Sequence, residues 1–280
     1  MKKENIQIVK SSGDRVDFSP SKLRSSLQKS GADAETVNSI LKTVQEELYQ
    51  DISTKEIYNR AFALLKKSKS VYASKYKLKK AIYELGPTGY FFENFIGALL
   101  KLSGYKVEID KIVQGKCVSH EVDVVASRNE QLIMVECKFH SDKTQKCNVK
   151  IPLYIDSRYR DIVARYKNSP QSPTEGWVVT NTRFTADAIT YGRCSQLYLL
   201  SWDHPGKNSL KDRIDRLGLY PITVSTLLTG REKQFLLSRN IVLCRQLADA
   251  LFYLDHLGIA ESRKKKILSE ISILCNFKKK

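Results

Sequence analysis

Two short runs of mostly apolar residues, 118–126 and 131–139, flank a polar turn at 127–130 and constrain the fold more than any other feature. Their length and alternation predict two antiparallel strands joined as a hairpin. Residues 104–107 are expected to form a further strand, and residues 90–100 have the apolar spacing of a helix. A helix followed by antiparallel strands indicates a domain that mixes α and β structure.

Charged side chains interrupt the apolar pattern of these elements. By the two-residue period of a strand, Glu136 and Lys138 point to the same face of the second strand. Asp123 lies inside the first strand among valines, where an unpaired carboxylate would be costly. Glu93 lies at the edge of the apolar stripe of the helix. Three carboxylates and a lysine embedded in this way need a shared partner.

A divalent cation is the partner that suits these groups. Asp123 and Glu136 offer the oxygen ligands that Mg²⁺ (or Mn²⁺) prefers, and the main-chain carbonyl of Cys137 is a further expected ligand. Glu93 is expected as an outer ligand, while Lys138 would orient or deprotonate the attacking water. The pattern therefore predicts a metal-dependent hydrolytic site with Glu93, Asp123, Glu136 and Lys138 as its catalytic residues.

This arrangement resembles the PD-(D/E)xK nuclease family, and its continuation resembles the core of Mrr-like restriction endonucleases. The resemblance implies an α/β core with a mixed sheet that cleaves DNA. Val122 stands where the family usually has proline. The segments that carry the resemblance are Glu93 on the first helix, Glu121-Val122-Asp123, Glu136-Cys137-Lys138, a buried strand at 176–180, a helix that opens at 184–188, and a closing strand at 197–200.

A cluster of helix breakers, Gly86-Pro87-Thr88-Gly89, separates this region from an N-terminal segment. Residues 6–18 predict a β-hairpin, and Ser19-Pro20 after it is a typical helix start. Ser53-Thr54-Lys55-Glu56 has the pattern of a capping box that opens a later helix. The segment is therefore expected to be a hairpin followed by a small helical bundle.

The same segment resembles the ATP-cone, a domain that binds ATP or dATP and regulates the protein that carries it. The resemblance rests on Val9-Lys10-x-x-Gly13, Phe18, Lys22-Leu23, Thr54-Lys55-Glu56-Ile57 and Ala73-Ser74-x-Tyr76. It implies nucleotide contacts from Val9, Lys10, Arg15, Lys22 and Thr54, with the two lysines on phosphates. Ammonium groups and a helix start both favour anions. The residues alone also allow a structural domain with solvated surface lysines.

The C-terminal segment predicts a small basic helical module. Two helices are expected to flank Leu257-Gly258-Ile259, with Lys264, Lys265 and Lys266 on the second. This resembles a helix-hairpin-helix, in which main-chain N–H groups near the glycine approach a DNA phosphate. A plain helical hairpin that serves packing or dimerisation is the alternative.

The charge balance favours a polyanionic partner. Lys and Arg total 47 against 30 Asp and Glu, a net charge of +17. Lys150 and Arg158 are expected to contact the DNA backbone. Asp142, Lys150 and Arg158 could instead belong to an extension of the active site. The cysteines lack the spacing of a zinc site. No stretch has the apolar length of a membrane span, so a cytoplasmic protein without a membrane partner is expected.

Three parts are predicted: an α+β nucleotide-binding domain at 1–85, an α/β nuclease domain at 87–203 and a helical module at 204–280. The predicted activity is Mg²⁺-dependent endonucleolytic cleavage of double-stranded DNA in restriction or phage defence. ATP, dATP or a related nucleotide would control it, and the protein would form a homo-oligomer. The alternative is a non-catalytic, nucleotide-responsive DNA-binding regulator, against which the intact set of Glu93, Asp123, Glu136 and Lys138 argues.

Overall fold

The computed structural model describes residues 6–276, and the chain divides into two compact units. The first unit comprises the residues up to 80 together with 224–229 and those from 259 onward. The second comprises residues 81–223 and 230–258. Each unit is therefore assembled from separate stretches of sequence. Within residues 6–276, no helix combines the length and the apolar character needed to cross a membrane.

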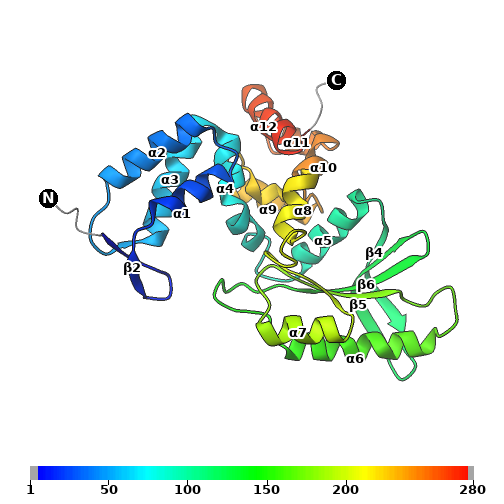
Figure 1. Ribbon diagram of the computed structural model, residues 1–280. Helices are drawn as coiled ribbons and strands as arrows, with labels where there is room; N and C mark the ends of the chain where they lie inside the picture. The colour runs from blue at the N-terminus through cyan, green and yellow to red at the C-terminus, as the bar shows by residue number, and fades with distance from the viewer. Residues whose placement is uncertain (1–5, 277–280) are drawn as a thin grey trace. The chain divides into compact units, whose positions relative to one another are not determined.

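The first unit contains a small sheet and a group of helices (Figure 1). Its three strands have the order β2-β1-β3, with β1 antiparallel to β2 and parallel to β3. Its elements are β1 (Gln7–Val9), β2 (Arg15–Asp17), α1 (Pro20–Gln28), α2 (Ala34–Glu46), β3 (Ile52–Ser53), α3 (Thr54–Ser68), α4 (Ser70–Tyr83, whose last residues belong to the second unit) and α12 (Glu261–Leu274).

Local sequence signals mark the starts of two of these helices. Ser19 accepts a hydrogen bond from the Lys22 N–H at the start of α1, with Pro20 in the first turn. Ser53 accepts one from the Glu56 N–H at the start of α3. Both predicted helix starts are confirmed. The apolar stripes of the helices meet in one core, of which Leu27, Val37, Val44, Ala61 and Leu65 are fully buried members.

A buried carboxylate joins α12 to this unit. Glu270, only 2% exposed, accepts hydrogen bonds from the hydroxyls of Ser74 on α4 at 2.7 Å and of Ser225 at 2.5 Å. The hydroxyl of Thr226 donates a third bond at 3.0 Å. The C-terminal helix therefore packs with the N-terminal elements, although about two hundred residues separate them along the chain.

The second unit is built on a five-stranded mixed sheet with the order β4-β5-β6-β7-β8. Strands β4, β5 and β6 are antiparallel, and β6, β7 and β8 are parallel. Its elements are α5 (Tyr90–Leu102), β4 (Lys106–Gln114), β5 (Ser119–Arg128), β6 (Gln131–Lys138), α6 (Lys150–Arg165), β7 (Glu175–Thr180), α7 (Ala186–Cys194), β8 (Tyr198–Leu200), α8 (Leu210–Leu217), the short 3-10 helix η1 (Ile222–Val224, whose last residue belongs to the first unit), α9 (Gly230–Ser238), α10 (Cys244–Ala248) and α11 (Phe252–His256).

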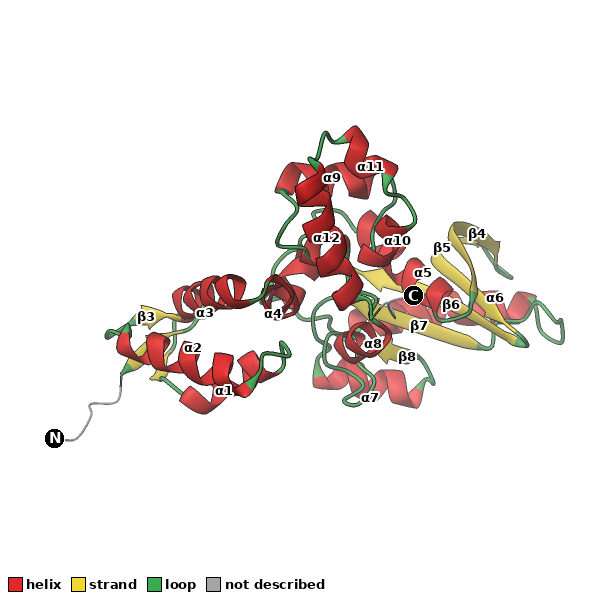
Figure 2. Ribbon diagram, turned by 90° about the horizontal axis from the view of Figure 1, so that it is seen from above, coloured by secondary structure: helices red, strands yellow, loops and turns green. Residues whose placement is uncertain are grey.

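Helices cover both faces of this sheet. Helix α5 lies on one face, and α6 and α7 lie on the other (Figure 1). In Figure 2 the strands are drawn in yellow, and β6 lies between β5 and β7. The α-β-β-β-α-β order predicted for the central segment is observed. The two strands that carry the predicted catalytic residues, β5 and β6, thus lie in the middle of a covered sheet.

The β5–β6 hairpin is tighter than the sequence suggests. Its last pair is Arg128 with Gln131, so the turn consists of Asn129 and Glu130 and not of all four residues at 127–130. Asn129 has a φ of 51°, in the left-handed region that asparagine tolerates better than most residues. This two-residue turn fixes the register that carries through to the functional residues.

The residues of the predicted C-terminal module are shared between the two units. Helices α8, α9, α10 and α11 belong to the second unit, whereas residues 224–229 and α12 belong to the first. The helices predicted for this segment are observed, but they are divided between the two compact units.

Candidate functional site

The main-chain pairing of β5 and β6 ends beside the predicted catalytic residues. Its last pair at this end is Val124 with Val135. One residue further, a side chain replaces the main-chain acceptor of β5: Asp123 Oδ2 accepts a hydrogen bond from the Cys137 N–H at 2.6 Å. The strands therefore separate at this point, and the Asp123 carboxylate is held between them.

Glu136 and Lys138 lie at the end of β6, on the face of the sheet that α6 covers. Met134, two residues before Glu136, packs on this face against Ile162 of α6. Arg158 of α6 donates a hydrogen bond from Nη1 to Glu136 Oε2 at 2.7 Å. The Lys138 ammonium has no ion-pair partner within residues 6–276. The lysine is therefore available for a ligand.

Glu93 enters the site from the first turn of α5. The neighbouring Phe92 is fully buried, and its ring lies 5.8 Å from that of Phe139, which follows β6. A Cβ added at Gly89 would lie 2.5 Å from Glu93 Oε1, so the glycine leaves room for the carboxylate. Packing of α5 on the sheet thus places Glu93 near the strand ends.

The carboxylates have raised pKa values, and burial is the largest cause for each. Burial and repulsion by Asp123 and Asp110 raise the pKa of Glu93 to about 7. Burial and Asp123 raise the pKa of Glu136 to about 7, against the opposing effect of Arg158. Burial also raises the pKa of Asp123, although the Cys137 N–H lowers it. The predicted residues are therefore close enough to repel one another as anions.

Asp110 is a further carboxylate of the site that the sequence did not single out. The β4–β5 register would set it opposite Asp123, but the pairing skips this position between Ile109–Val124 and Lys111–Val122. Asp110 has a φ of 51°, in the left-handed region. Its charge contributes to the raised pKa values of Glu93 and Asp123. Because Lys106, Glu108 and Lys111 on β4 are also charged, no local signal marks this aspartate.

The donor set suits a hard divalent cation. Within residues 6–276, no three His, Cys, Asp or Glu side chains form a ready-made cage. Asp123 and Glu136 offer carboxylate oxygens, and the Cys137 carbonyl points to the same side of β6 as its N–H, where the β5 pairing has ended. Mg²⁺ usually takes one or two carboxylates and keeps several waters. A cation held in this way would also offset the repulsion among the acidic groups.

A second candidate site is a pocket of about 250 Å³ in the first unit. Three of the five residues implied by the ATP-cone resemblance line it: Lys10, Lys22 and Thr54. Val9 and Arg15 do not line it. Arg15 instead forms an exposed ion pair with Asp51, with 2.9 Å between Nε and Oδ1. The pocket also has an aromatic wall, formed by the rings of Tyr58 and Tyr76, which stack at 5.0 Å.

The residues predicted to contact DNA have different surroundings. Lys150 is exposed in the first turn of α6, whereas Arg158 is directed to Glu136. Gly258 has a positive φ of 66°, but its N–H donates to the Asp255 carbonyl at 2.8 Å, so it is not directed to a phosphate.

The predicted lysine cluster lies on α12 in the first unit. Lys264 pairs with Glu261 at 2.7 Å, and Lys265 and Lys266 are exposed. Two of the three lysines therefore offer charge to the solvent.

Comparison with known proteins agrees with the two resemblances found in the sequence. Residues 6–84 match the ATP cone domain, and residues 86–204 match a restriction endonuclease domain. Residues 220–275 match a third family, described as AF1548-like, C-terminal. The predicted ATP-cone followed by a restriction endonuclease core is thus confirmed, and the central domain is of a nuclease type.

Two relatives extend this similarity. An uncharacterized protein of Archaeoglobus fulgidus is 30% identical over 176 residues, which cover 61% of this chain and 95% of that protein. The crystal structure of the protein of unknown function AF1548 has a TM-score of 0.54 at 28% identity, and the match covers 67% of this chain and 98% of that chain. The chain therefore belongs to the family of this Archaeoglobus protein, and it combines an ATP cone domain, a restriction endonuclease domain and an AF1548-like C-terminal domain.

Proposed function

We propose that the protein is an Mg²⁺- or Mn²⁺-dependent endonuclease that hydrolyses phosphodiester bonds in double-stranded DNA and is controlled by a nucleotide bound in the ATP cone. Glu93, Asp123, Glu136 and Lys138 are its catalytic residues. The restriction endonuclease match over residues 86–204 supports this class of activity.

The observation that carries the proposal is the separation of β5 and β6 at a group of partly buried carboxylates. Asp123 and Glu136 lie at adjacent strand ends, and Glu93 reaches them from α5. Burial of like charges is unfavourable unless something compensates them. A bound cation would compensate these carboxylates, so their clustering where the two strands separate supports a role as metal ligands.

Each residue has a chemical role in the hydrolysis. Asp123, Glu136 and the Cys137 carbonyl would hold the cation, with Glu93 as an outer ligand. When bound, Mg²⁺ neutralises phosphate charge and makes a water molecule a better nucleophile. Lys138 orients the attacking water or takes the proton that the water loses. A new bond forms between the water oxygen and phosphorus, the bond from phosphorus to one sugar oxygen breaks, and that oxygen takes a proton from solvent.

Double-stranded DNA is the proposed substrate. The net charge of +17 supplies attraction to a polyanion, independent of its sequence. Lys150, exposed at the start of α6, belongs to the same unit as the catalytic residues and is proposed to contact the backbone. Lys265 and Lys266 of the first unit are proposed to add further phosphate contacts.

Control by ATP, dATP or a related nucleotide is proposed for the first unit. The pocket combines two lysines and a threonine with an aromatic wall, which are groups that suit phosphates and a base. A basic nuclease without such a restraint would threaten the chromosome of its own cell. We therefore propose a cytoplasmic defence enzyme in which the nucleotide shifts the balance between homo-oligomeric assemblies of different activity.

Plasmid cleavage tests the proposal. Full-length protein is incubated with supercoiled DNA and Mg²⁺ or Mn²⁺, with and without ATP or dATP, beside Lys138→Ala and an EDTA control. Metal-dependent nicking or linearisation that disappears in Lys138→Ala is expected. Full activity in Lys138→Ala would refute the assignment of the site. DNA binding without cleavage under every metal and nucleotide condition would instead favour a non-catalytic, nucleotide-responsive regulator.

A further inference from the structure

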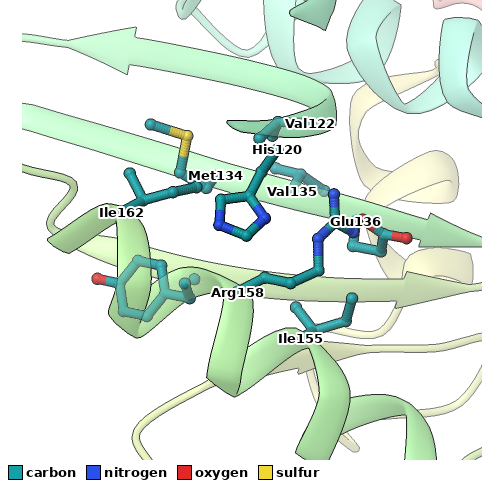
Figure 3. Close-up of a pocket in the computed structure, with 10 residues that line it drawn as sticks. His120, Val122, Met134, Val135, Glu136, Ile155, Arg158 and Ile162 are labelled. Atoms are coloured by element: carbon teal, nitrogen blue, oxygen red, sulfur yellow. Dashed lines mark hydrogen bonds and ion pairs between the residues drawn. The ribbon is translucent and has the colours of Figure 1, made fainter. Parts of the chain in front are cut away.

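Arg158 is the basic side chain of α6 that contacts a proposed metal ligand. Its Nη1 donates to Glu136 Oε2 at 2.7 Å, and its Nη2 donates to the Glu121 carbonyl on β5. The side chains of Arg158 and Glu136 are only 18% and 17% exposed. Figure 3 shows the arginine reaching from α6 to the glutamate on β6. The guanidinium therefore connects the helix to both catalytic strands.

The surroundings of this pair are mostly apolar and leave little room for water. Arg158 and Glu136 line a cavity of about 20 Å³, large enough for about one water molecule. Val122, Met134 and Ile162 are among the other residues that line it (Figure 3). Charges interact more strongly in such surroundings than in bulk water. The ion pair is thus a partly buried structural contact and not a flexible surface pair.

A second polar contact fixes the helix that carries Arg158. Asp161, one turn further along α6, accepts hydrogen bonds from the Cys117 N–H at 2.9 Å and from the Val118 N–H at 3.3 Å. Its Oδ2 also lies 2.8 Å from His120 Nε2. Helix α6 is therefore fastened to the start of β5, a few residues before Asp123. This attachment sets the position from which Arg158 reaches Glu136.

The contact occupies one carboxylate oxygen and leaves the other. Within residues 6–276, Oε1 of Glu136 has no hydrogen-bond partner. We propose that Arg158 is a positioning residue that holds Glu136 by Oε2 and so presents Oε1 to the divalent cation. This inference rests on the proposed metal-dependent nuclease function. Carboxylates that bind metals are commonly held by such outer hydrogen-bond partners, and their loss usually weakens metal affinity or activity by about 10–100-fold.

This role differs from a contact with the DNA backbone. A phosphate would have to compete with both acceptors that the two Arg158 nitrogens already hold. Arg160, two residues away on the same helix, is 70% exposed and pairs with Asp156 at 2.9 Å. It is a suitable matched control, because it has the same charge and an ion pair of its own but lies outside the carboxylate group.

The test measures metal binding without relying on cleavage. Mn²⁺ is titrated calorimetrically into the full-length wild type, Arg158→Ala, Arg158→Lys and Arg160→Ala, and thermal unfolding in EDTA checks that each variant is folded. Arg158→Ala is expected to weaken Mn²⁺ affinity by about 10–100-fold. Arg158→Lys should lose less Mn²⁺ affinity, because the lysine keeps a positive charge beside Glu136. Some loss should remain, because a lysine cannot also donate to the Glu121 carbonyl. Arg160→Ala should stay within about twofold of the wild type.

Three outcomes would overturn the inference. Equal or tighter Mn²⁺ binding by Arg158→Ala would mean that the arginine does not support the ligand or competes with the metal. Unchanged Mn²⁺ binding, with a salt dependence of DNA affinity reduced by about one unit, would identify a phosphate contact. If Arg158→Ala does not fold, Arg158→Lys and Arg158→Gln are compared, and equal affinity in these two would refute a role for the charge.

The failure of this inference can be told apart from failure of the proposed function. A wild type that binds no Mn²⁺ and cleaves no DNA would remove the metal-dependent function, and the inference would fall with it. A wild type that binds Mn²⁺ and cleaves DNA, beside an Arg158→Ala variant that does both equally well, would remove only the role of Arg158.

Discussion

The Asp123 carboxylate and the Cys137 main chain are joined by a hydrogen bond of 2.6 Å, from the Cys137 N–H to Asp123 Oδ2. The bond stands where a main-chain carbonyl of β5 would otherwise pair with β6. Asp123 is therefore proposed to have two roles, one in closing the end of the ladder and one as a metal ligand. Substitutions that keep the acceptor but remove the charge can separate them.

Asp123→Asn should lose cleavage but keep the fold. The amide oxygen can still accept from the Cys137 N–H, whereas the charged ligand is gone. Because the loss of an outer partner of a metal ligand already costs about 10–100-fold, loss of the ligand should exceed about 100-fold. Asp123→Ala should be equally inactive and also less stable than Asp123→Asn by about 1–3 kcal/mol, since the Cys137 N–H loses its acceptor. Urea unfolding and plasmid cleavage measure the two effects, and equal stability of both variants would contradict the structural role.

The metal-free protein should lose stability as the pH rises. Glu93 and Glu136 have pKa values of about 7 in the folded protein, raised from 4.5. Between these values the folded protein holds protons that the unfolded chain has lost. The free energy of unfolding therefore falls from about pH 4.5 to about pH 7 and levels off above that. For Glu136 the change is at most roughly 3 kcal/mol.

Thermal unfolding in EDTA across this pH range measures the effect. Glu136→Gln should flatten the dependence, whereas Glu108→Gln, on the exposed part of β4, should not. Adding Mn²⁺ should stabilise the wild type most at high pH, because the carboxyl groups must lose their protons to bind it. Stability in EDTA that rises with pH in wild type and Glu136→Gln alike would contradict the raised pKa values.

Much of the fold could be predicted from the sequence because its signals are local. Apolar alternation defines β5 and β6, and a serine or a serine-proline pair marks the starts of α1 and α3. The proposed catalytic residues stood out for a related reason, since carboxylates such as Asp123 interrupt an apolar strand. A charge in the wrong place is visible without any knowledge of the tertiary structure.

Other features depend on contacts that no local pattern reports. Asp110 reaches the site only through the register of β4 on β5, and Arg158 meets Glu136 only because α6 packs across the sheet. Arg15 follows the hairpin turn as expected, yet its pair with Asp51 takes it away from the nucleotide pocket. The packing of α12 in the first unit likewise depends on a long-range contact, the hydrogen bond between Ser74 and Glu270. These residues look like ordinary surface charges in the sequence.

Nucleotide binding should depend on the lysines that line the pocket. Lys10→Ala/Lys22→Ala should weaken ATP or dATP binding by about tenfold or more, because each lysine offers a charged contact to a phosphate. Lys42→Ala/Lys66→Ala removes the same charge outside the pocket and should have little effect. Arg15→Ala should resemble this control. Calorimetric titration of full-length protein measures the affinities, and an equal loss in both double variants would indicate general electrostatic attraction in place of a built site.

Glu270 should be the residue of α12 on which the stability of the first unit depends most. Its carboxylate is 2% exposed and accepts from three hydroxyls, those of Ser74, Ser225 and Thr226. Glu270→Leu removes the carboxylate that accepts from the three hydroxyls, which should cost about 2–4 kcal/mol. Glu270→Gln keeps one acceptor oxygen and should cost less. Glu261→Gln, 76% exposed on the same helix, is the matched control and should change stability by under about 0.5 kcal/mol. Denaturant unfolding, followed together with nucleotide binding, should show earlier loss of binding in Glu270→Leu alone. If Glu270→Leu and Glu261→Gln unfold alike, α12 is not held to α4 by this carboxylate.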